Sequence, residues 1–332
     1  MSSIPPVRLL DRTCVASLIG LDECMNAVES AFASHERGRT LAPDLAHVDA
    51  VDGEFHIKCG GLRDPRPYFA CKVNGSFFQN TARSDLPNIL GLIILSDASN
   101  GRPLAILESG LITRLRTAAA TAIAAKYLAR PESESVTICG AGLQGAAQLR
   151  ALTRVLPIRH AFIWSRSATR AHQLAAEAAA ELGIVVEPVS DLGLATRNSD
   201  VIVTCTPSKD WFLGRAHVRG GTFIAAVGAD APGKQELEPE LVAKSTVYCD
   251  LVEQCLRVGE LQHAFARGLI TREHAGGTLG GLIVGNAPGR RDEEEITLFD
   301  STGTALQDVA ASALVYERAE AANLGTMISF WP

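Results

Sequence analysis

The sequence predicts an α/β protein with two domains, one a doubly wound parallel sheet covered by helices and the other a mixed α+β domain. The chain has 332 residues, which is the length of one large or two ordinary domains. Hydrophobic residues make up 47% of it and charged residues 20%, a composition that excludes a disordered chain. From residue 135 onward, apolar strand-like runs alternate with helical periodicities, which is typical of a parallel sheet.

The N-terminal part predicts one helix, several strands and then a second helix. Apolar residues follow the spacing of an amphipathic helix over 22–37. Short apolar runs predict strands at 69–73, 91–96 and 104–107. The turn signal at 97–101 makes the last two strands a hairpin. An Ala-rich helix is predicted over 113–129, with Thr113 as its N-cap.

The following part predicts repeated strand–helix units. Strands are predicted at 136–139, 161–164, 200–204 and 222–227. Helices are predicted at 142–156, 168–182 and, near the C-terminus, 304–322. We therefore expect the mixed part to come first and the parallel α/β part second.

Charge and residue usage exclude several classes of protein. Lys plus Arg is 31 and Asp plus Glu is 37, which gives a net charge of −6 and argues against a nucleic-acid binder. No apolar window is long enough for a membrane span, and the N-terminus does not have the pattern of a signal peptide. The eight cysteines include no C-x-x-C pair, so we expect free, buried thiols and a cytoplasmic location. The eight histidines show no metal-binding spacing, and no metal site is predicted.

A G-x-G-x-x-G motif directly follows a predicted strand and opens a predicted helix. Gly140 permits a tight turn, Gly142 lets the backbone approach a pyrophosphate, and Gly145 lets helix and strand pack closely. The helix N-terminus then presents N–H groups to the phosphates. This predicts a Rossmann-type dinucleotide site, with an ordinary glycine-bearing turn as the alternative. The other candidate coenzyme contacts are Thr117, Leu143, Gln144, Thr206, Val227, Gly228, Asp300 and Ser301.

The end of the second predicted strand bears on the choice of coenzyme. Proteins that select NAD normally place an acidic residue there to bind the ribose hydroxyls. Here the strand ends in Ser165 and Arg166, which suit a 2′-phosphate. The sequence therefore favours NADP(H) over NAD(H), with a solvated Arg166 as the alternative.

Three cations and one acid are placed unusually. Lys58 and Lys72 stand inside apolar, strand-like runs, where lysine is seldom buried without a partner. Arg116 lies in an Ala-rich helix whose small residues allow a ligand to approach. Asp230 follows an apolar strand in a glycine turn, where an open parallel sheet binds its ligands. For Lys58, Lys72 and Arg116 the alternative is a side chain turned to solvent.

Five motifs occur along the chain in a fixed order. They are KVN (72–74), LITRLRTAA (111–119), GAGLQG (140–145), GADAPGKQEL (228–237) and FDSTG (299–303). Together they are specific, and from about residue 20 to the C-terminus the chain resembles the ornithine cyclodeaminase/mu-crystallin family. The likeness is greatest to its alanine dehydrogenase and ketimine reductase branches.

The resemblance implies roles for several of these residues. Lys72 and Asp230 would serve the chemistry, and Arg116 would bind the substrate carboxylate. It also implies a homodimer formed through the non-Rossmann domain, to which the C-terminal helix returns. We therefore predict a Rossmann NAD(P)-binding domain over 113–303, and a substrate-binding and dimerisation domain over 1–112 and 304–332.

The chain departs from the family pattern at three positions. Family members often carry Arg in place of His56, and Lys58 is the candidate substitute because it shares a strand face with that position. Members that use NAD carry Asp in place of Ser165. Mu-crystallin, a ketimine reductase that uses NADPH, lacks that Asp but also lacks the acid that matches Asp230. No single member's specificity can therefore be transferred to this chain.

The resemblance predicts an NAD(P)H-dependent imino-acid or ketimine reductase, or an amino-acid dehydrogenase. The hydride would pass between the nicotinamide and the α-carbon of an α-imino or α-amino acid. One alternative is an ornithine or lysine cyclodeaminase, an ammonia-lyase that recycles its coenzyme internally. The other is an NADPH-binding protein without turnover. The substrate stays open, and the positive charge of His56 and Lys58 beside Lys72 and Arg116 admits a dicarboxylic imine.

Overall fold

The computed structural model describes residues 4–331, and the chain divides into two compact units. Unit 1 is formed by Met1–Arg116 together with Thr304–Pro332, and unit 2 is Thr117–Gly303. The sequence places the first boundary at 112/113. The structure places it at 116/117, and both boundaries fall within helix α4 (Ser109–Leu128), whose residues are divided between the two units.

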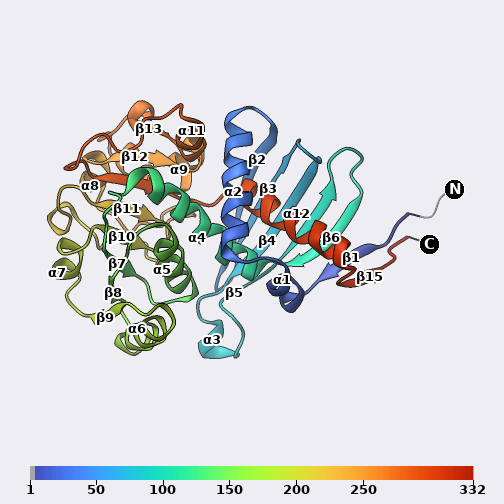
Figure 1. Cartoon of the computed structure of the whole chain (residues 1–332), viewed down its shortest axis with the longest axis horizontal. Helices are drawn as coiled ribbons and strands as arrows, with labels where there is room; N and C mark the ends of the chain where they lie inside the picture. Colours follow the sequence, from blue (N-terminus) through green and yellow to red (C-terminus); the bar gives the residue numbers. More distant parts are fainter. Residues whose placement is uncertain (1–3, 332) are drawn as a thin grey trace. The chain divides into compact units, whose positions relative to one another are not determined.

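Unit 1 is built on a seven-stranded sheet. Its strands, in spatial order, are β15 (Thr326–Ile328), β1 (Val7–Leu10), β6 (Pro103–Glu108), β5 (Ile89–Asp97), β4 (Tyr68–Ser76), β3 (Glu54–Leu62) and β2 (Thr40–Asp49). The pairs from β6 to β2 are all antiparallel, while β1 pairs parallel to β6. The helices of this unit are α1 (Arg12–Leu18), α2 (Leu21–Glu36), the short α3 (Asn80–Arg83) and α12 (Ala305–Ala322). Helices α2 and α12 contact each other on one face of the sheet (Figure 1).

Local chemistry explains the ends of these elements. The predicted hairpin is confirmed: the Asp97 N–H donates to the Arg102 carbonyl at 2.9 Å, and Gly101 adopts a φ of 79°. The predicted N-cap at Thr113 is wrong, because α4 begins at Ser109. The Glu108 carboxylate accepts the N–H groups of residues 110 and 111 at 2.7 and 3.0 Å, so the acid at the end of β6 supplies the cap.

The two faces of the unit 1 sheet differ in polarity. Side chains alternate along a strand, so residues two apart share a face. On the face covered by α12, the buried residues of β3 and β4 include polar ones, and Lys58 lies directly opposite Lys72. The opposite face leaves Val73, Leu92 and Ile94 40%, 54% and 46% exposed. This apolar outward face is uncovered in the single chain.

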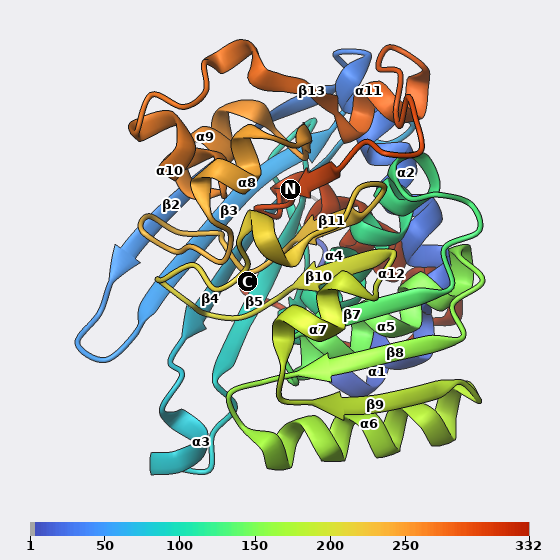
Figure 2. The same ribbon diagram turned by 90° about the vertical axis from the view of Figure 1, so that its left-hand side faces the viewer.

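Unit 2 contains an eight-stranded sheet in which every pairing is parallel. Its spatial order is β13 (Ala275–Thr278), β12 (Thr246–Cys249), β14 (Thr297–Asp300), β11 (Phe223–Ala226), β10 (Val201–Thr204), β7 (Ser135–Cys139), β8 (His160–Trp164) and β9 (Val185–Val189). Figure 2 shows β10, β7, β8 and β9 following one another across the sheet. The helices are α5 (Leu143–Val155), α6 (Ala168–Leu182), α7 (Leu192–Arg197), α8 (Pro239–Ala243), α9 (Val252–Val258), α10 (Leu261–Ala266) and α11 (Leu279–Val284), with short 3₁₀ turns η1 (Arg215–His217) and η2 (Arg272–His274). The predicted doubly wound fold is confirmed.

The sequence patterns do not predict β9, β12, β13 or β14. Each of these strands has only four or five residues and includes polar, glycine or proline residues, whereas the equally short β10 and β11 are recognised by their more continuous apolar runs. Strand β9 also carries Pro188, which is tolerated because β9 is an edge strand.

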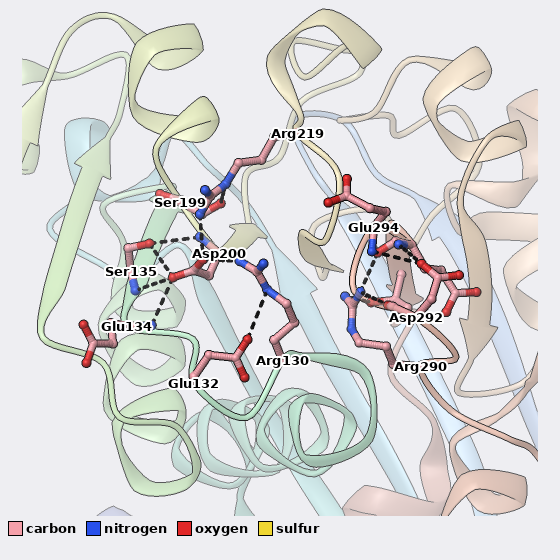
Figure 3. Close-up of polar contacts among 12 residues, drawn as sticks. Arg130, Glu132, Glu134, Ser135, Ser199, Asp200, Arg219, Arg290, Asp292 and Glu294 are labelled. Carbon is pink, nitrogen blue, oxygen red and sulfur yellow. Dashed lines mark hydrogen bonds and ion pairs between the residues drawn. The ribbon is translucent and has the colours of Figure 1, made fainter.

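The Asp200 carboxylate forms several hydrogen bonds at the edge of the unit 2 sheet where the strands begin (Figure 3). Asp200, directly before β10, accepts hydrogen bonds from Arg130 and Arg219, both at 2.6 Å. It also accepts the Ser135 hydroxyl at 2.7 Å and the N–H groups of Glu134 and Ser135 at 3.0 and 3.1 Å. These bonds tie the start of β10 to the start of β7. The opposite, carboxyl edge is where open parallel sheets bind ligands.

All eight cysteines are free thiols in the structure. Those at 24, 139, 249 and 255 are buried, while those at 14, 59, 71 and 205 are partly exposed, which corrects the expectation of burial there. Cys59 and Cys71 are partly exposed because they lie on the outward face of the unit 1 sheet. None of the described helices combines the length and apolar character required to cross a membrane.

Candidate active site

The turn between β7 and α5 has the backbone that the glycine motif predicts. Gly140 has a φ of 130°, which side chains other than glycine rarely adopt. A Cβ on Gly145 would lie 2.0 Å from the Gly140 carbonyl oxygen, so helix and turn approach too closely for any side chain. A Cβ on Gly142 would meet no atom within 4 Å. The three glycines thus provide a tight turn, close packing of helix and turn, and open space at the start of the helix.

The start of α5 fits a bound dinucleotide. Gly142 is its N-cap, and no side chain caps the helix. The Gln144 Nε2 atom is buried without a hydrogen-bond partner among the described residues, and Leu143 is exposed beside it. Uncapped N–H groups at a helix N-terminus are suited to a pyrophosphate. A pyridine nucleotide held here would supply the hydride for a redox reaction.

Ser165 and Arg166 follow β8, the strand next to β7, at the carboxyl edge of the sheet. Arg166 is exposed, and the Ser165 hydroxyl accepts the N–H of Ser167 at 3.3 Å. Neither residue is a carboxylate that would repel a 2′-phosphate.

Asp230 lies in the turn after β11, as the sequence predicts, and it has an ion-pair partner that the sequence does not single out. The Lys234 ammonium donates to the Asp230 carboxylate at 2.8 Å. Lys234 is 6% exposed, whereas the side chain of Asp230 is 32% exposed, so the lysine is buried and its carboxylate partner is partly accessible. Asp230 is therefore held as an oriented carboxylate at the carboxyl edge of unit 2.

A buried carboxylate joins the loops that follow β10 and β11. Glu236 accepts the N–H groups of Thr206 at 2.6 Å and of Gly228 at 3.0 Å. Its burial raises the pKa of this carboxyl group to about 7, against the effect of these hydrogen bonds. Glu236 thus fixes the backbone of Thr206 and Gly228, two of the predicted coenzyme contacts. The backbone N–H of Val227, a third predicted contact, donates to the Thr204 carbonyl at 2.8 Å.

Two other predicted coenzyme contacts lie at the end of β14. The Asp300 carboxylate is fully buried and accepts the Leu261 N–H at 3.0 Å, and its burial raises its pKa to about 7. This side chain therefore orders the protein's own backbone. Ser301 is also buried, and its hydroxyl has no hydrogen-bond partner among the described residues. Thr117, at the start of unit 2, is buried within α4.

Unit 1 brings Lys72 and Arg116 together through a third residue, Asp308. The Lys72 ammonium lies 2.8 and 2.7 Å from the two oxygens of the Asp308 carboxylate. Arg116 Nε donates to the same carboxylate at 3.1 Å, and its Nη1 donates to Gln307 at 2.6 Å. Lys72, Arg116 and Asp308 are 2%, 4% and 1% exposed. Residues from β4, α4 and α12 thus form one buried cluster.

This cluster perturbs the acidity of its members. Burial, reinforced by the positive charge of Arg116, lowers the pKa of Lys72 to about 7, and Asp308 opposes that shift. Burial by itself would raise the pKa of Asp308, but the charges of Lys72 and Arg116 outweigh it and hold that pKa below its usual value. An amine that titrates near neutrality is suited to donate or accept a proton.

Lys58 and His56, the other two candidate substrate contacts, lie on the same buried face. They are 3% and 4% exposed, and Lys58 lowers the pKa of Lys72. The His56 Nε2 and the Glu54 carboxylate are 2.9 Å apart. With His47, these two residues place three possible metal ligands within 4.8 Å. Because the positive charge of Lys58 on the same strand face disfavours a cation, the absence of a metal stays our prediction.

Sequence reasoning misses Asp308, Gln307, Lys234 and Glu236. Asp308 did carry a signal, because it is a lone acid within the apolar run that opens α12. Such a residue is seldom buried without a cationic partner. Its partner Lys72 is 236 positions away, and a local pattern cannot identify a pair at that distance.

The parallel sheet and its uncapped glycine turn define a dinucleotide-binding protein. Within that class, the chain belongs to the ornithine cyclodeaminase/mu-crystallin family, whose family model matches residues 8–323. The predicted family is thereby confirmed.

Known relatives cover almost the whole chain. An iminosuccinate reductase from Paracoccus denitrificans is 38% identical over 311 residues, which are 92% of this chain and 94% of the relative. A solved archaeal structure, described as an alanine dehydrogenase dimer with bound NAD, has 37% identity and a TM-score of 0.92 over 98% of this chain and 99% of that one. The Δ1-pyrroline-2-carboxylate reductase of Thermococcus litoralis, solved with NADH and L-proline, has 32% identity and a TM-score of 0.93 over 96% of this chain and 99% of that one. The predicted enzyme class, an NAD(P)-dependent oxidoreductase acting on C=N or CH–NH₂ groups, is confirmed at this level.

Proposed function

We propose that the protein reduces α-imino acids to α-amino acids with NAD(P)H, and catalyses the reverse oxidation. The observation that carries this proposal is the buried Lys72–Asp308–Arg116 cluster, which offers a guanidinium and an amine that titrates near neutrality. The glycine turn of unit 2 would hold the nucleotide, which would supply the hydride for the α-carbon of the imine.

Arg116 binds the α-carboxylate of the substrate. Its Nε and Nη1 atoms are occupied by Asp308 and Gln307, and its Nη2 has no acceptor among the described residues. A carboxylate at Nη2 would make a charge-assisted hydrogen bond in a buried setting, which fixes the position of the α-carbon. Lys58, buried on the same strand face, contributes further positive charge.

Lys72 and Asp230 manage protons. When an imine forms from a keto acid and ammonia, a hydroxyl group must leave, and protonated Lys72 can donate the proton that converts it into water. Asp230 stabilises the protonated, electrophilic form of the imine nitrogen. The Lys234 ammonium, 2.8 Å away, orients this carboxylate.

The test combines the purified protein, NADPH and a panel of mono- and dicarboxylic α-imino acids, followed by the absorbance of reduced coenzyme. A dicarboxylic imine belongs in the panel because a relative is named as an iminosuccinate reductase. Net consumption of NADPH supports the proposal. Ammonia release from ornithine or lysine without net consumption would instead identify a cyclodeaminase, and tight NADPH binding without turnover would identify a binding protein.

We propose that NADP(H) is preferred over NAD(H), because the residues after β8 are Ser165 and Arg166. The two solved relatives named above bind NAD or NADH. We expect Arg166→Ala to weaken kcat/KM for NADPH about tenfold, through loss of a phosphate contact, and to change that for NADH little. Steady-state kinetics with both coenzymes measures this. Equal or better efficiency of the unchanged protein with NADH would refute the preference.

We also propose that a second copy of the chain covers the apolar outward face of the unit 1 sheet. The archaeal relative described as a dimer supports this. Leu92 lies on this face and is 54% exposed. We expect Leu92→Lys to convert the dimer to a monomer in light scattering, because a buried lysine without a partner is costly. Val185→Lys, at an equally exposed site in β9, is the control and should not change the mass. A wild-type monomer would contradict the proposal.

A further inference from the structure

We propose that Asp308 is a positioning residue for the reaction inferred above, acting through Lys72 and Arg116. Its carboxylate keeps the Lys72 amine protonated and fixes the direction in which Arg116 presents its remaining donors. The effect of Asp308 on catalysis rests on the proposed function, whereas its effect on the protonation of the Lys72 amine does not.

The geometry gives Asp308 two tasks at once. Both of its oxygens lie within 2.8 Å of the Lys72 ammonium, and one of them also accepts from Arg116 Nε at 3.1 Å. Gln307, its neighbour in the same turn of α12, accepts from Arg116 Nη1 at 2.6 Å. Two contacts from one rigid turn determine the plane of the guanidinium. A substrate carboxylate then meets Nη2 without a search among side-chain conformers.

The charges around the Lys72 amine make Asp308 necessary. Lys58 faces it from β3 and Arg116 faces it from α4, and both disfavour its charged form. Cys24 on α2 interacts with Arg116 and Asp308, but its burial raises its pKa to about 12, so the thiol is neutral near pH 7. His56 and Glu54 lie further along β3 and are 2.9 Å apart. Among the described residues, Asp308 is the carboxylate that contacts both Lys72 and Arg116.

The position of Asp308 in its helix supports the ionised form. It lies in the first turn of α12, whose N-cap is Thr304. The positive end of the helix dipole stabilises an anion there. Lysine 72 thus receives its counter-charge from an acid that stays ionised across the range in which the amine titrates.

The experiment measures the Lys72 amine directly in protein labelled with ¹³C-lysine, with the signal assigned by its loss in Lys72→Met. We expect the wild-type signal to titrate near pH 7, and Asp308→Asn to move its midpoint down by about one to three units. Ser312→Ala is the matched control, because it removes a buried hydroxyl one turn further along α12 without changing charge. It should leave the midpoint unchanged.

Kinetics provide the second readout. The alkaline limb of kcat/KM for reductive amination of a keto acid with ammonia, in which Lys72 protonates the leaving hydroxyl, should move down with the NMR midpoint in Asp308→Asn and return toward the wild-type position in Asp308→Glu. Circular dichroism tests whether each variant is folded. If the Asp308→Asn variant is not folded, the Lys72 midpoint and the kinetics are compared between the wild type and Asp308→Glu instead. An unchanged Lys72 midpoint in Asp308→Asn would overturn the inference. If the wild-type protein reduces no imine, the proposed function fails, but the NMR titration still decides the role of Asp308.

Discussion

Replacing Lys72 by methionine is expected to lower reductive turnover about 10³-fold, the central value for loss of a positioned general acid. Methionine fills a similar apolar volume but carries no proton. The proposed nucleotide contacts all belong to unit 2, so we expect the affinity for NADPH not to change. Single-turnover kinetics with saturating keto acid, ammonia and NADPH includes the step in which the hydroxyl leaves, and calorimetry measures nucleotide binding.

Lys244→Met is the control for the removal of a lysine, because Lys244 is exposed at the end of α8. It should retain wild-type turnover. A folded Lys72→Met protein with near-normal turnover would remove Lys72 from the mechanism.

The pH dependence of the same reaction follows from the lowered pKa of Lys72, about 7. Reductive amination of a keto acid uses the protonated amine to release the hydroxyl as water, so its kcat/KM should fall about tenfold per pH unit above that value. Oxidation of the amino acid uses the neutral amine, so its kcat/KM should rise to a plateau as pH increases through the same value. Opposite limbs in the two directions would be expected of a single group that donates a proton one way and accepts it the other.

The parts of the fold that the sequence predicts are those with a local physical cause. Helix α6 is found at 168–182 as expected, because its amphipathic stripe and its Ser167 cap lie within the segment itself. The sequence pattern misplaces the start of α4 because the helix is capped by the Glu108 carboxylate, and Glu108 is also the last residue of the preceding strand β6. Strand β12 is buried and shows no alternation, and its four residues form a shorter aliphatic run than the Val-Ile-Val of β10, which the sequence does predict.

The candidate site divides in the same way. The glycine turn is readable because its three conformational demands fall within six consecutive residues, 140–145. Lys72 and Arg116 are noticeable because each is a cation in an apolar context. Asp308, the acid that bridges them, cannot be inferred from the sequence around either cation, because all of unit 2 lies between β4 and α12 in the sequence. Resemblance to a family supplied the roles of these residues, and the structure supplied the partner.

Two alanine substitutions in the glycine turn should separate nucleotide binding from folding. In Gly145→Ala the new Cβ would lie 2.0 Å from the Gly140 carbonyl oxygen, so α5 or the turn must move. Overpacking of this kind costs about 1–3 kcal/mol, and we expect denaturant unfolding to show a loss of that size. Nucleotide affinity should fall as well, because the displaced turn no longer presents its N–H groups.

Gly142→Ala should have the opposite profile. Its Cβ meets no protein atom within 4 Å, and its φ of −103° is open to alanine, so the free energy of unfolding should stay close to that of the wild type. The methyl group projects toward the place where a pyrophosphate would approach the helix N-terminus. We expect NADPH affinity to fall about 100-fold, or about 2.8 kcal/mol. Each variant is the control for the other, and unchanged NADPH affinity in a folded Gly142→Ala protein would mean that the nucleotide does not bind at this turn.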